Sequence, residues 1–83
     1  MTTSLLSVEQ LRQQVRVRLA QGRLPIAGGV YRIHRGTGRP CVVCRRAVAA
    51  AEAQCEVDGV GAHEACYMLW REESVLFLTP RRP

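Results

Sequence analysis

Four residues of the chain have the types and spacing of a metal-ligand set. Cys41 and Cys44 form one pair separated by two residues, and His63 and Cys66 form a second pair with the same separation. The eighteen residues between the pairs are enough to fold back and bring both to one ion. Zinc accepts thiolate sulfur and imidazole nitrogen in tetrahedral geometry. The pattern therefore predicts one structural zinc ion per chain, with no position left open for water.

A different use of the cysteines would be disulfide formation. Four cysteines, Cys55 among them, could pair in three ways. Such pairing would leave His63 without a role and would need an oxidising compartment. A redox motif of thioredoxin type is also disfavoured, because no strand–motif–helix pattern surrounds Cys41. Zinc binding is the preferred interpretation.

Two residues with ligand chemistry stand outside the two pairs. Cys55 alternates with Val57 in a segment expected to be a strand, so we predict a buried small apolar residue. A substitute ligand or a redox-sensitive thiol are the alternatives. His34 is interpreted as an ordinary strand or loop residue rather than a fifth ligand.

The length of the chain explains why a metal would be needed. Its 83 residues make one domain at most, and only four of them are aromatic. A domain of this size buries little apolar surface and is marginally stable. A structural zinc site adds an apparent binding energy of about 10–16 kcal/mol to small folds of this kind.

An amphipathic helix is predicted from Ser7 to about Gly22. Ser7 and Gln10 match a capping box, and Gly22 stands where the left-handed residue after a helix belongs. The preceding residues, 1–6, are expected to form a frayed tail. The helix could pack on the rest of the chain, stand apart, or pair with its copy in a homodimer. Its apolar stripe consists of Leu5, Val8, Leu11, Val15 and Leu19.

The segments after this helix are expected to be short. Residues 23–29 contain Pro25 and two glycines and are predicted to be a linker. Residues 30–34 can form a strand. A β-hairpin is expected over residues 47–57, ending at Asp58-Gly59 and Gly61.

The last part of the chain is predicted to contain a helix and a strand. The helix should begin at about Ala62, with Leu69 and Trp70 on the same side as Cys66. Residues 75–78 form an apolar run that we interpret as a final strand stopped by Pro80.

The ligand pattern resembles the first zinc module of LIM domains and, more broadly, the treble-clef finger. The resemblance covers residues 41–67 and includes an aromatic residue, Tyr67, directly after the last cysteine. It implies a zinc knuckle, a hairpin and a helix carrying the second ligand pair. No further ligand pairs follow, so only the first LIM module is matched. Small bacterial proteins of unassigned role share a similar pattern, here Gly36, Gly38, Pro40, Cys41, Cys44, His63, Cys66, Tyr67 and Trp70.

Together these features predict a small α+β zinc-stabilised domain. An N-terminal tail, amphipathic helix and linker would occupy residues 1–29. A treble-clef module resembling part of a LIM domain would occupy residues 30–80, and a basic tail would occupy residues 81–83.

No enzyme is expected, because the site has no open metal position and no nucleophile beside a free base. Glu72 and Glu73 are interpreted as solvated surface. The net charge is +5, and all twelve basic residues are arginines. A GC-rich genome would produce the same bias, while a basic face for nucleic acid is the functional alternative.

Two binding functions therefore remain open. The preferred one is a protein-interaction module, acting as an adaptor or inhibitor of a larger assembly, as LIM-type modules bind proteins. The alternative is a nucleic-acid-binding regulator of the kind that GATA-type treble clefs represent. Residues 5–19 and 75–78 are the candidate apolar surfaces. The candidate contacts to a partner or to nucleic acid are Arg12, Arg16, Arg35, Arg39, Arg45 and Arg46.

The expected location is the cytoplasm. Residues 1–6 have no basic region of the kind that begins a secretory signal, and no stretch is long enough to span a membrane. Thiols stay reduced in the cytoplasm, where clustered cysteines more often bind metal than form disulfides.

Overall fold

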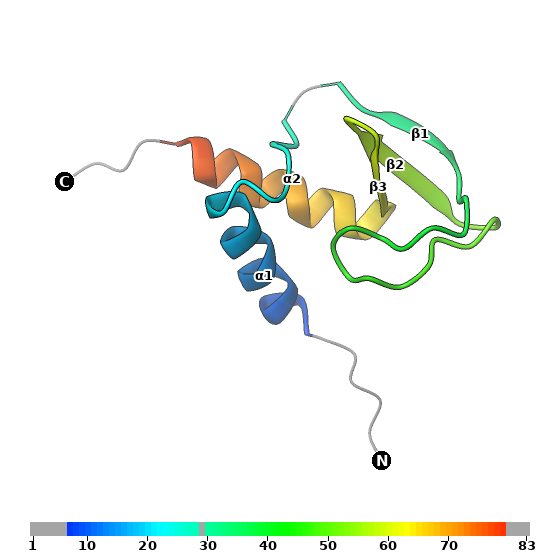
Figure 1. The fold of residues 1–83 in the computed structure, drawn as a ribbon, viewed down its shortest axis with the longest axis horizontal. Coiled ribbons are helices and arrows are strands. Elements are labelled where there is room, and N and C mark those ends of the chain that lie inside the picture. The colour runs from blue at the N-terminus through cyan, green and yellow to red at the C-terminus, as the bar shows by residue number, and fades with distance from the viewer. Residues whose placement is uncertain (1–6, 29, 80–83) are drawn as a thin grey trace, which may run out of the picture.

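The structure is a computed structural model that describes residues 7–28 and 30–79. Within these ranges two helices accompany a three-stranded antiparallel sheet in which β2 lies between β1 and β3 (Figure 1). The predicted tails at 1–6 and 81–83, Leu5 of the stripe and the stop at Pro80 lie outside the described residues. The elements are α1 (Val8–Ala20), β1 (Arg32–Arg35), β2 (Ala53–Val57), β3 (Val60–His63) and α2 (Glu64–Leu78).

Helix α1 begins and ends as its sequence predicts. The Ser7 hydroxyl accepts a hydrogen bond from the Gln10 backbone N–H at 3.2 Å, and the Ser7 N–H donates to Gln10 Oε1 at 2.9 Å. Gly22 follows the helix with a φ of 72°, a conformation that suits a residue without Cβ. Val15 and Leu19 of the predicted stripe are buried, which confirms the face on which α1 packs.

The β2–β3 hairpin is built around the Asp58-Gly59 turn. This turn was predicted from the sequence at the end of the hairpin rather than at its centre. Asp58 and Gly59 both have positive φ, at 50° and 79°. Positive φ at both central residues is characteristic of the two-residue turn that joins tightly paired strands. The hairpin therefore extends to both sides of Asp58-Gly59, with Gln54 paired to His63. The predicted range of the hairpin, residues 47–57, therefore lay too close to the N-terminus.

The first strand was also displaced. It covers Arg32–Arg35 rather than residues 30–34, and it pairs with β2 in antiparallel register, with Ile33 opposite Cys55. All four of its residues are exposed. The ends of the strand are therefore not marked in the sequence by residues that must be buried.

Helix α2 corrects two predictions. Residues 75–78 are its last turn rather than a strand, because a short apolar run fits either structure and the preceding helix continues through it. The helix begins at Glu64 rather than at Ala62, which still belongs to β3 and pairs with Cys55. Leu69 and Trp70, predicted to share one side of this helix, are both buried.

Residues 23–28 of the predicted linker are packed across α2. Trp70 is fully buried and its Nε1–H donates to the Pro25 carbonyl at 3.0 Å. The Ala27 N–H donates to Ser74 Oγ at 3.0 Å. Leu24 and Ala27 are buried in the same core as Val15 and Trp70. The segment thus connects α1 to the sheet and also covers the middle of α2.

The prediction that Glu73 lies on the solvated surface was wrong. Its side chain is buried where α1 packs against α2, with the residue only 2% exposed. Arg16 Nε lies 2.7 Å from one carboxylate oxygen, and Arg12 Nη1 lies 3.0 Å from the other. Arg12 also reaches Glu72, which remains exposed, at 2.7 Å. The sequence did not reveal this network, because the partners are about sixty residues apart in the chain.

Candidate metal centre

The first ligand pair lies in a tight loop between β1 and β2. The Cys41 N–H donates to the Arg46 carbonyl at 2.7 Å, and the Arg45 N–H donates to the Cys41 carbonyl at 2.9 Å. Arg45 has a φ of 72°, and a bridge between Pro40 and Ala47 closes the loop behind it. This turn places Cys41 and Cys44 on one side.

The second ligand pair lies where β3 passes into α2. His63 is the last residue of the strand and the residue before the first turn of the helix. Cys66 stands within that first turn, where the partial positive charge of the helix N-terminus favours a thiolate. The hairpin therefore carries His63 and Cys66 back to the loop that holds the first pair.

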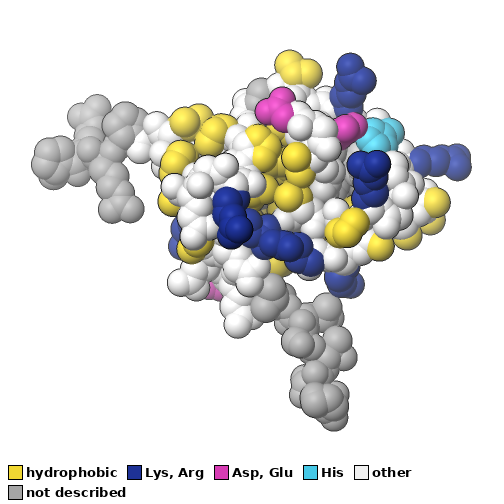
Figure 2. Space-filling model, in the orientation of Figure 1, with side chains coloured by type: hydrophobic (Ala, Val, Ile, Leu, Met, Phe, Trp, Pro, Cys, Tyr) yellow, Lys and Arg dark blue, Asp and Glu magenta, His cyan; other side chains and the backbone are white. Residues whose placement is uncertain are grey.

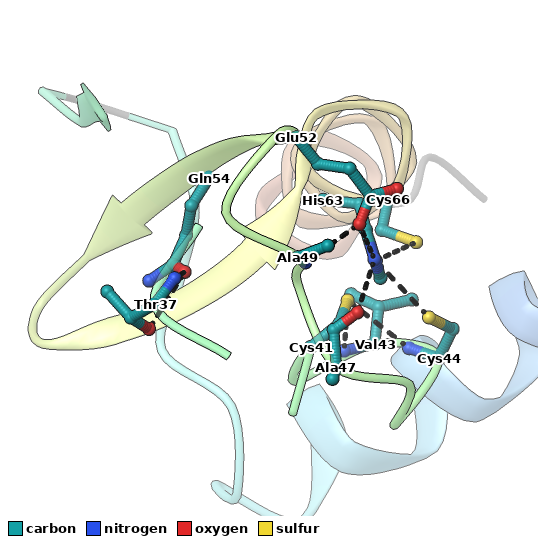
Figure 3. A network of polar contacts seen from close by, with 10 residues as sticks. All are labelled: Thr37, Cys41, Val43, Cys44, Ala47, Ala49, Glu52, Gln54, His63 and Cys66. Atoms are coloured by element: carbon teal, nitrogen blue, oxygen red, sulfur yellow. Dashed lines mark hydrogen bonds and ion pairs between the residues drawn. The ribbon is translucent and has the colours of Figure 1, made fainter. Parts of the chain in front are cut away.

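The structure brings all four predicted ligands together (Figure 3). One ligand atom from each of Cys41, Cys44, His63 and Cys66 lies within 4.8 Å of every other. His63 Nδ1 is 3.4 Å from Cys44 Sγ and 4.0 Å from Cys66 Sγ. A tetrahedral zinc ion would separate such atoms by roughly 3.5–3.8 Å. The four residues thus lie at metal-binding distance from one another.

The hydrogen bonds of His63 select the tautomer that a metal needs. Its Nε2 lies 3.2 Å from the Ala47 carbonyl oxygen and 3.5 Å from Glu52 Oε1. A carbonyl oxygen can only accept, so Nε2 carries the hydrogen and Nδ1 of the neutral ring presents a lone pair to the sulfurs. Glu52 is itself held by the Ala49 N–H, which donates to its carboxylate at 2.8 Å. The ligand nitrogen is therefore oriented by groups outside the cluster.

The electrostatics of the sulfurs favour one thiolate when the cluster holds no ion. A hydrogen bond from Cys66 lowers the pKa of Cys41 most strongly; burial opposes this, and nearby backbone groups lower it further. The Val43 and Cys44 N–H groups lie 3.4 and 3.5 Å from Cys41 Sγ. The same hydrogen bond, with burial, raises the pKa of the Cys66 thiol and so opposes the loss of its proton despite the helix N-terminus. Binding of a divalent ion would release this proton, as metal–thiolate bonds require.

The two spare residues lie outside the cluster. Cys55 is 1% exposed in the middle of β2, and burial raises the pKa of its thiol. The prediction of a buried apolar role is confirmed. His34 lies on β1, where its ring nitrogens contact the Arg35 carbonyl at 2.8 Å and Glu56 at 3.1 Å. These two contacts raise its pKa, with the backbone contact the larger cause.

Sequence reasoning missed three supports of the site. Ala47 contributes only a backbone carbonyl, which no side-chain pattern can reveal. Glu52 belongs to neither ligand pair, so the ligand pattern gives it no role. Gly36 lies very close to the loop that follows Cys44. A Cβ added to Gly36 would be 2.0 Å from the Ala49 carbonyl oxygen. A glycine in the motif before Cys41 was the available signal for this close approach.

The arginines predicted as partner contacts lie on different elements of the fold. Arg12 and Arg16 bind acidic residues of α2 within the chain. Arg35 ends β1, and the pKa of Arg46 is raised chiefly by a hydrogen bond with the Cys44 side chain. Arg39 and Arg45 line a groove next to the knuckle. Among the residues that the structure describes, no ion pair involves Arg35, Arg39, Arg45 or Arg46.

Comparison of the chain with protein-family models, with curated proteins and with solved structures found no match. In the described ranges, no helix combines the length and the apolar character needed to cross a membrane.

Proposed function

We propose that the chain is a non-enzymatic zinc-binding protein that acts as a protein-interaction module. The observation that carries the metal part is the compact set of one nitrogen and three sulfur atoms at Cys41, Cys44, His63 and Cys66. Soft sulfur ligands with one imidazole favour zinc over magnesium, calcium or manganese. Four protein ligands complete a tetrahedral shell, which supports a structural role rather than catalysis.

A treble-clef arrangement is part of the proposal. The order of a cysteine loop, the β2–β3 hairpin and a helix that begins at the second ligand pair supports it. One zinc ion would then join the loop, the hairpin and α2. Cytoplasmic thiols stay reduced and available to the metal, and this compartment is proposed as the location.

The interaction part rests on the end of α2. Its last turn exposes four consecutive apolar side chains, with between 49% and 62% of each residue accessible. Four consecutive residues project in all directions around a helix, so one packed face cannot cover them all. An apolar turn of this kind favours contact with a partner protein. The residues are Val75, Leu76, Phe77 and Leu78.

The homodimer predicted through the N-terminal helix could use only the exposed part of the predicted stripe. Val15 and Leu19 are already buried within the chain, whereas Val8 and Val17 of α1 remain exposed. A partner that covers α2 is therefore the preferred form of the proposal.

Nucleic-acid binding is the second candidate. It is favoured by Arg35, Arg39, Arg45 and Arg46, for which the described residues supply no ion pair. The engagement of Arg12 and Arg16 by Glu73 removes two charges from such a surface. Binding to generic DNA or RNA that weakens steeply with salt would support this candidate.

Native mass spectrometry of the protein purified without added reductant tests the metal part. We expect a mass gain of one zinc ion per chain, lost in Cys66→Ser and kept in Cys55→Ser. Absence of metal together with a mass lower by two or four hydrogens would indicate disulfides and overturn the proposal.

Affinity purification tests the interaction part. We expect a protein that co-purifies with the wild-type chain to be lost with the double variant Leu76→Ser and Phe77→Ser. The matched control is Val8→Ser with Val17→Ser, which removes exposed apolar side chains from α1. Equal retention by both variants would remove α2 as the interaction surface.

A further inference from the structure

A groove of about 820 Å³ lies beside the metal cluster, and Cys41 is the one ligand that contributes to its lining. It is bounded by the end of α1, the start of the segment after α1, residues 37–41 that lead into the first ligand pair, and the β2–β3 hairpin. Four arginines from these different elements line it: Arg18, Arg23, Arg39 and Arg45. Arginine side chains occupy several parts of the face seen in Figure 2, with only a few acidic side chains among them.

The positive charge of the groove is not neutralised within the described part of the chain. None of its four arginines belongs to an ion pair there. Arg18 is fixed by donating to the Val42 carbonyl. Burial lowers the pKa of Arg18 most, and the nearby Arg45 and Arg23 cations lower it further, while the Cys41 thiolate opposes them. Like charges are thus held close together.

Negative charge near the groove does not cancel this surplus. Glu56 is the acidic residue in its lining, and its carboxylate already contacts His34. A zinc ion with three thiolates and a neutral imidazole carries a net charge of about −1. The groove remains net positive after both contributions.

A buried amide adds a directional donor to the groove. Gln54 is 5% exposed, and its Oε1 accepts from the Thr37 N–H and hydroxyl, both at 3.1 Å (Figure 3). The hydrogen bonds of this side chain within residues 7–28 and 30–79 are made by Oε1, and Nε2 is not sealed from solvent. A Cβ at Gly61 would lie 2.3 Å from that nitrogen, so the amide occupies space left by a missing side chain. Gln54 and Gly61 both line the groove.

The rest of the lining favours a peptide over a nucleic acid. Pro40, Val42 and Val60 supply an apolar wall, and the described lining contains no Phe, Tyr or Trp on which a base could stack. Guanidinium groups bind carboxylates through paired N–H donors, and an amide N–H can bind a peptide carbonyl.

We propose that this groove binds an extended segment of a partner protein in which glutamate or aspartate alternates with small apolar residues. The carboxylates contact Arg23, Arg39 and their neighbours, and the Gln54 amide donates to the peptide backbone. The inference rests on the proposed role as a protein-interaction module, and it adds a second contact surface whose lining does not include the apolar end of α2.

The test uses the full zinc-loaded chain and a fluorescein-labelled peptide of about ten residues, with glutamate alternating with valine and serine so that the acids project to one side. Fluorescence anisotropy measures Kd at about 50 mM and about 300 mM salt. The double variant Arg23→Gln with Arg39→Gln should raise Kd about tenfold, since each exposed charge pair contributes modestly. The control, Arg32→Gln with Arg71→Gln, makes the same charge change outside the groove and should change Kd less than about twofold.

Three results would overturn the proposal. They are equal weakening in both double variants, tighter binding of an oligothymidine of equal charge than of the peptide, and no peptide binding at the lower salt. Native mass spectra of the same samples separate this proposal from the previous one. If the chain binds metal but not the peptide, only the groove proposal is wrong. If the chain binds the peptide through Arg23 and Arg39 but holds no metal, only the zinc proposal is wrong.

Discussion

Two halves of this chain are held together in different ways. The metal half, residues 36–66, consists mainly of loop and hairpin, and four ligand side chains converge within it. The helix half, residues 7–28 and 67–79, is held by Trp70, by an apolar face of α1 and by the buried Glu73. Side chains from both halves join one core cluster.

The comparison shows how a short chain divides its sources of stability. A metal cross-link acts as a unit, because losing one ligand weakens the binding of all the others. Packing and ion pairs act in smaller steps that depend on the cavity or the unpaired charge that a substitution leaves. The following predictions test whether this division holds, beginning with the largest effect.

Loss of one ligand should disrupt the metal half most. Cys66→Ser should abolish stoichiometric zinc binding, because structural sites of this kind contribute about 10–16 kcal/mol as a complete set. Amide spectra by NMR should lose dispersed signals from residues 36–66 and keep helical signals from α1. Simultaneous loss of all signals would show that the two halves fold as one cooperative unit and would break the comparison.

Truncation of the central aromatic residue should destabilise the helix half. Trp70→Ala should lower the free energy of unfolding by about 3–5 kcal/mol, since the side chain is fully buried. Trp70→Phe keeps most of the volume and loses the bond to the Pro25 carbonyl, so it should cost about 1–2 kcal/mol. Urea unfolding of the zinc-loaded variants measures both values, and zinc stoichiometry should stay at one.

Removal of the buried carboxylate charge should have a smaller, pH-dependent effect. Burial raises the pKa of Glu73, but hydrogen bonds from Arg16 and Arg12 outweigh it, so the folded pKa lies below the ordinary 4.5. The stabilisation is therefore complete above the unfolded pKa and is lost as pH falls through the lower, folded value. Glu73→Gln should cost about 2 kcal/mol at neutral pH.

Two measurements check the behaviour of Glu73. Urea unfolding at pH 7 should show the loss in Glu73→Gln and not in the exposed control Glu64→Gln. Carboxyl titration by NMR should give Glu73 a pKa below the ordinary 4.5. A higher pKa for Glu73 would mean that burial, not the arginines, dominates this site.

The spare cysteine should have the smallest effect. Cys55→Ala leaves space for about one methyl group in β2, which typically costs about 1 kcal/mol. Zinc stoichiometry should be unchanged, since Cys55 lies outside the cluster. Reduced zinc binding in this variant would assign Cys55 to the site and contradict the ligand set.

Local patterns were sufficient to predict the cluster and the first helix. The ligand pairs are each three residues apart, and the capping pair of Ser7 and Gln10 is equally local. Features that depend on contact between distant segments were missed, and the pairing of Arg16 with Glu73 is an example. The helical state of residues 75–78 was missed for a different reason. Helix propensity and apolar character do not separate a helix from a strand in so short a run.

The position of His63 restricts how the length of this chain can vary. It pairs with Gln54 in the hairpin, precedes the first turn of α2 and faces the three sulfurs. One residue inserted between Gln54 and His63 would shift the strand register and turn alternate side chains to the opposite face. Homologous sequences that keep the site should therefore keep this spacing.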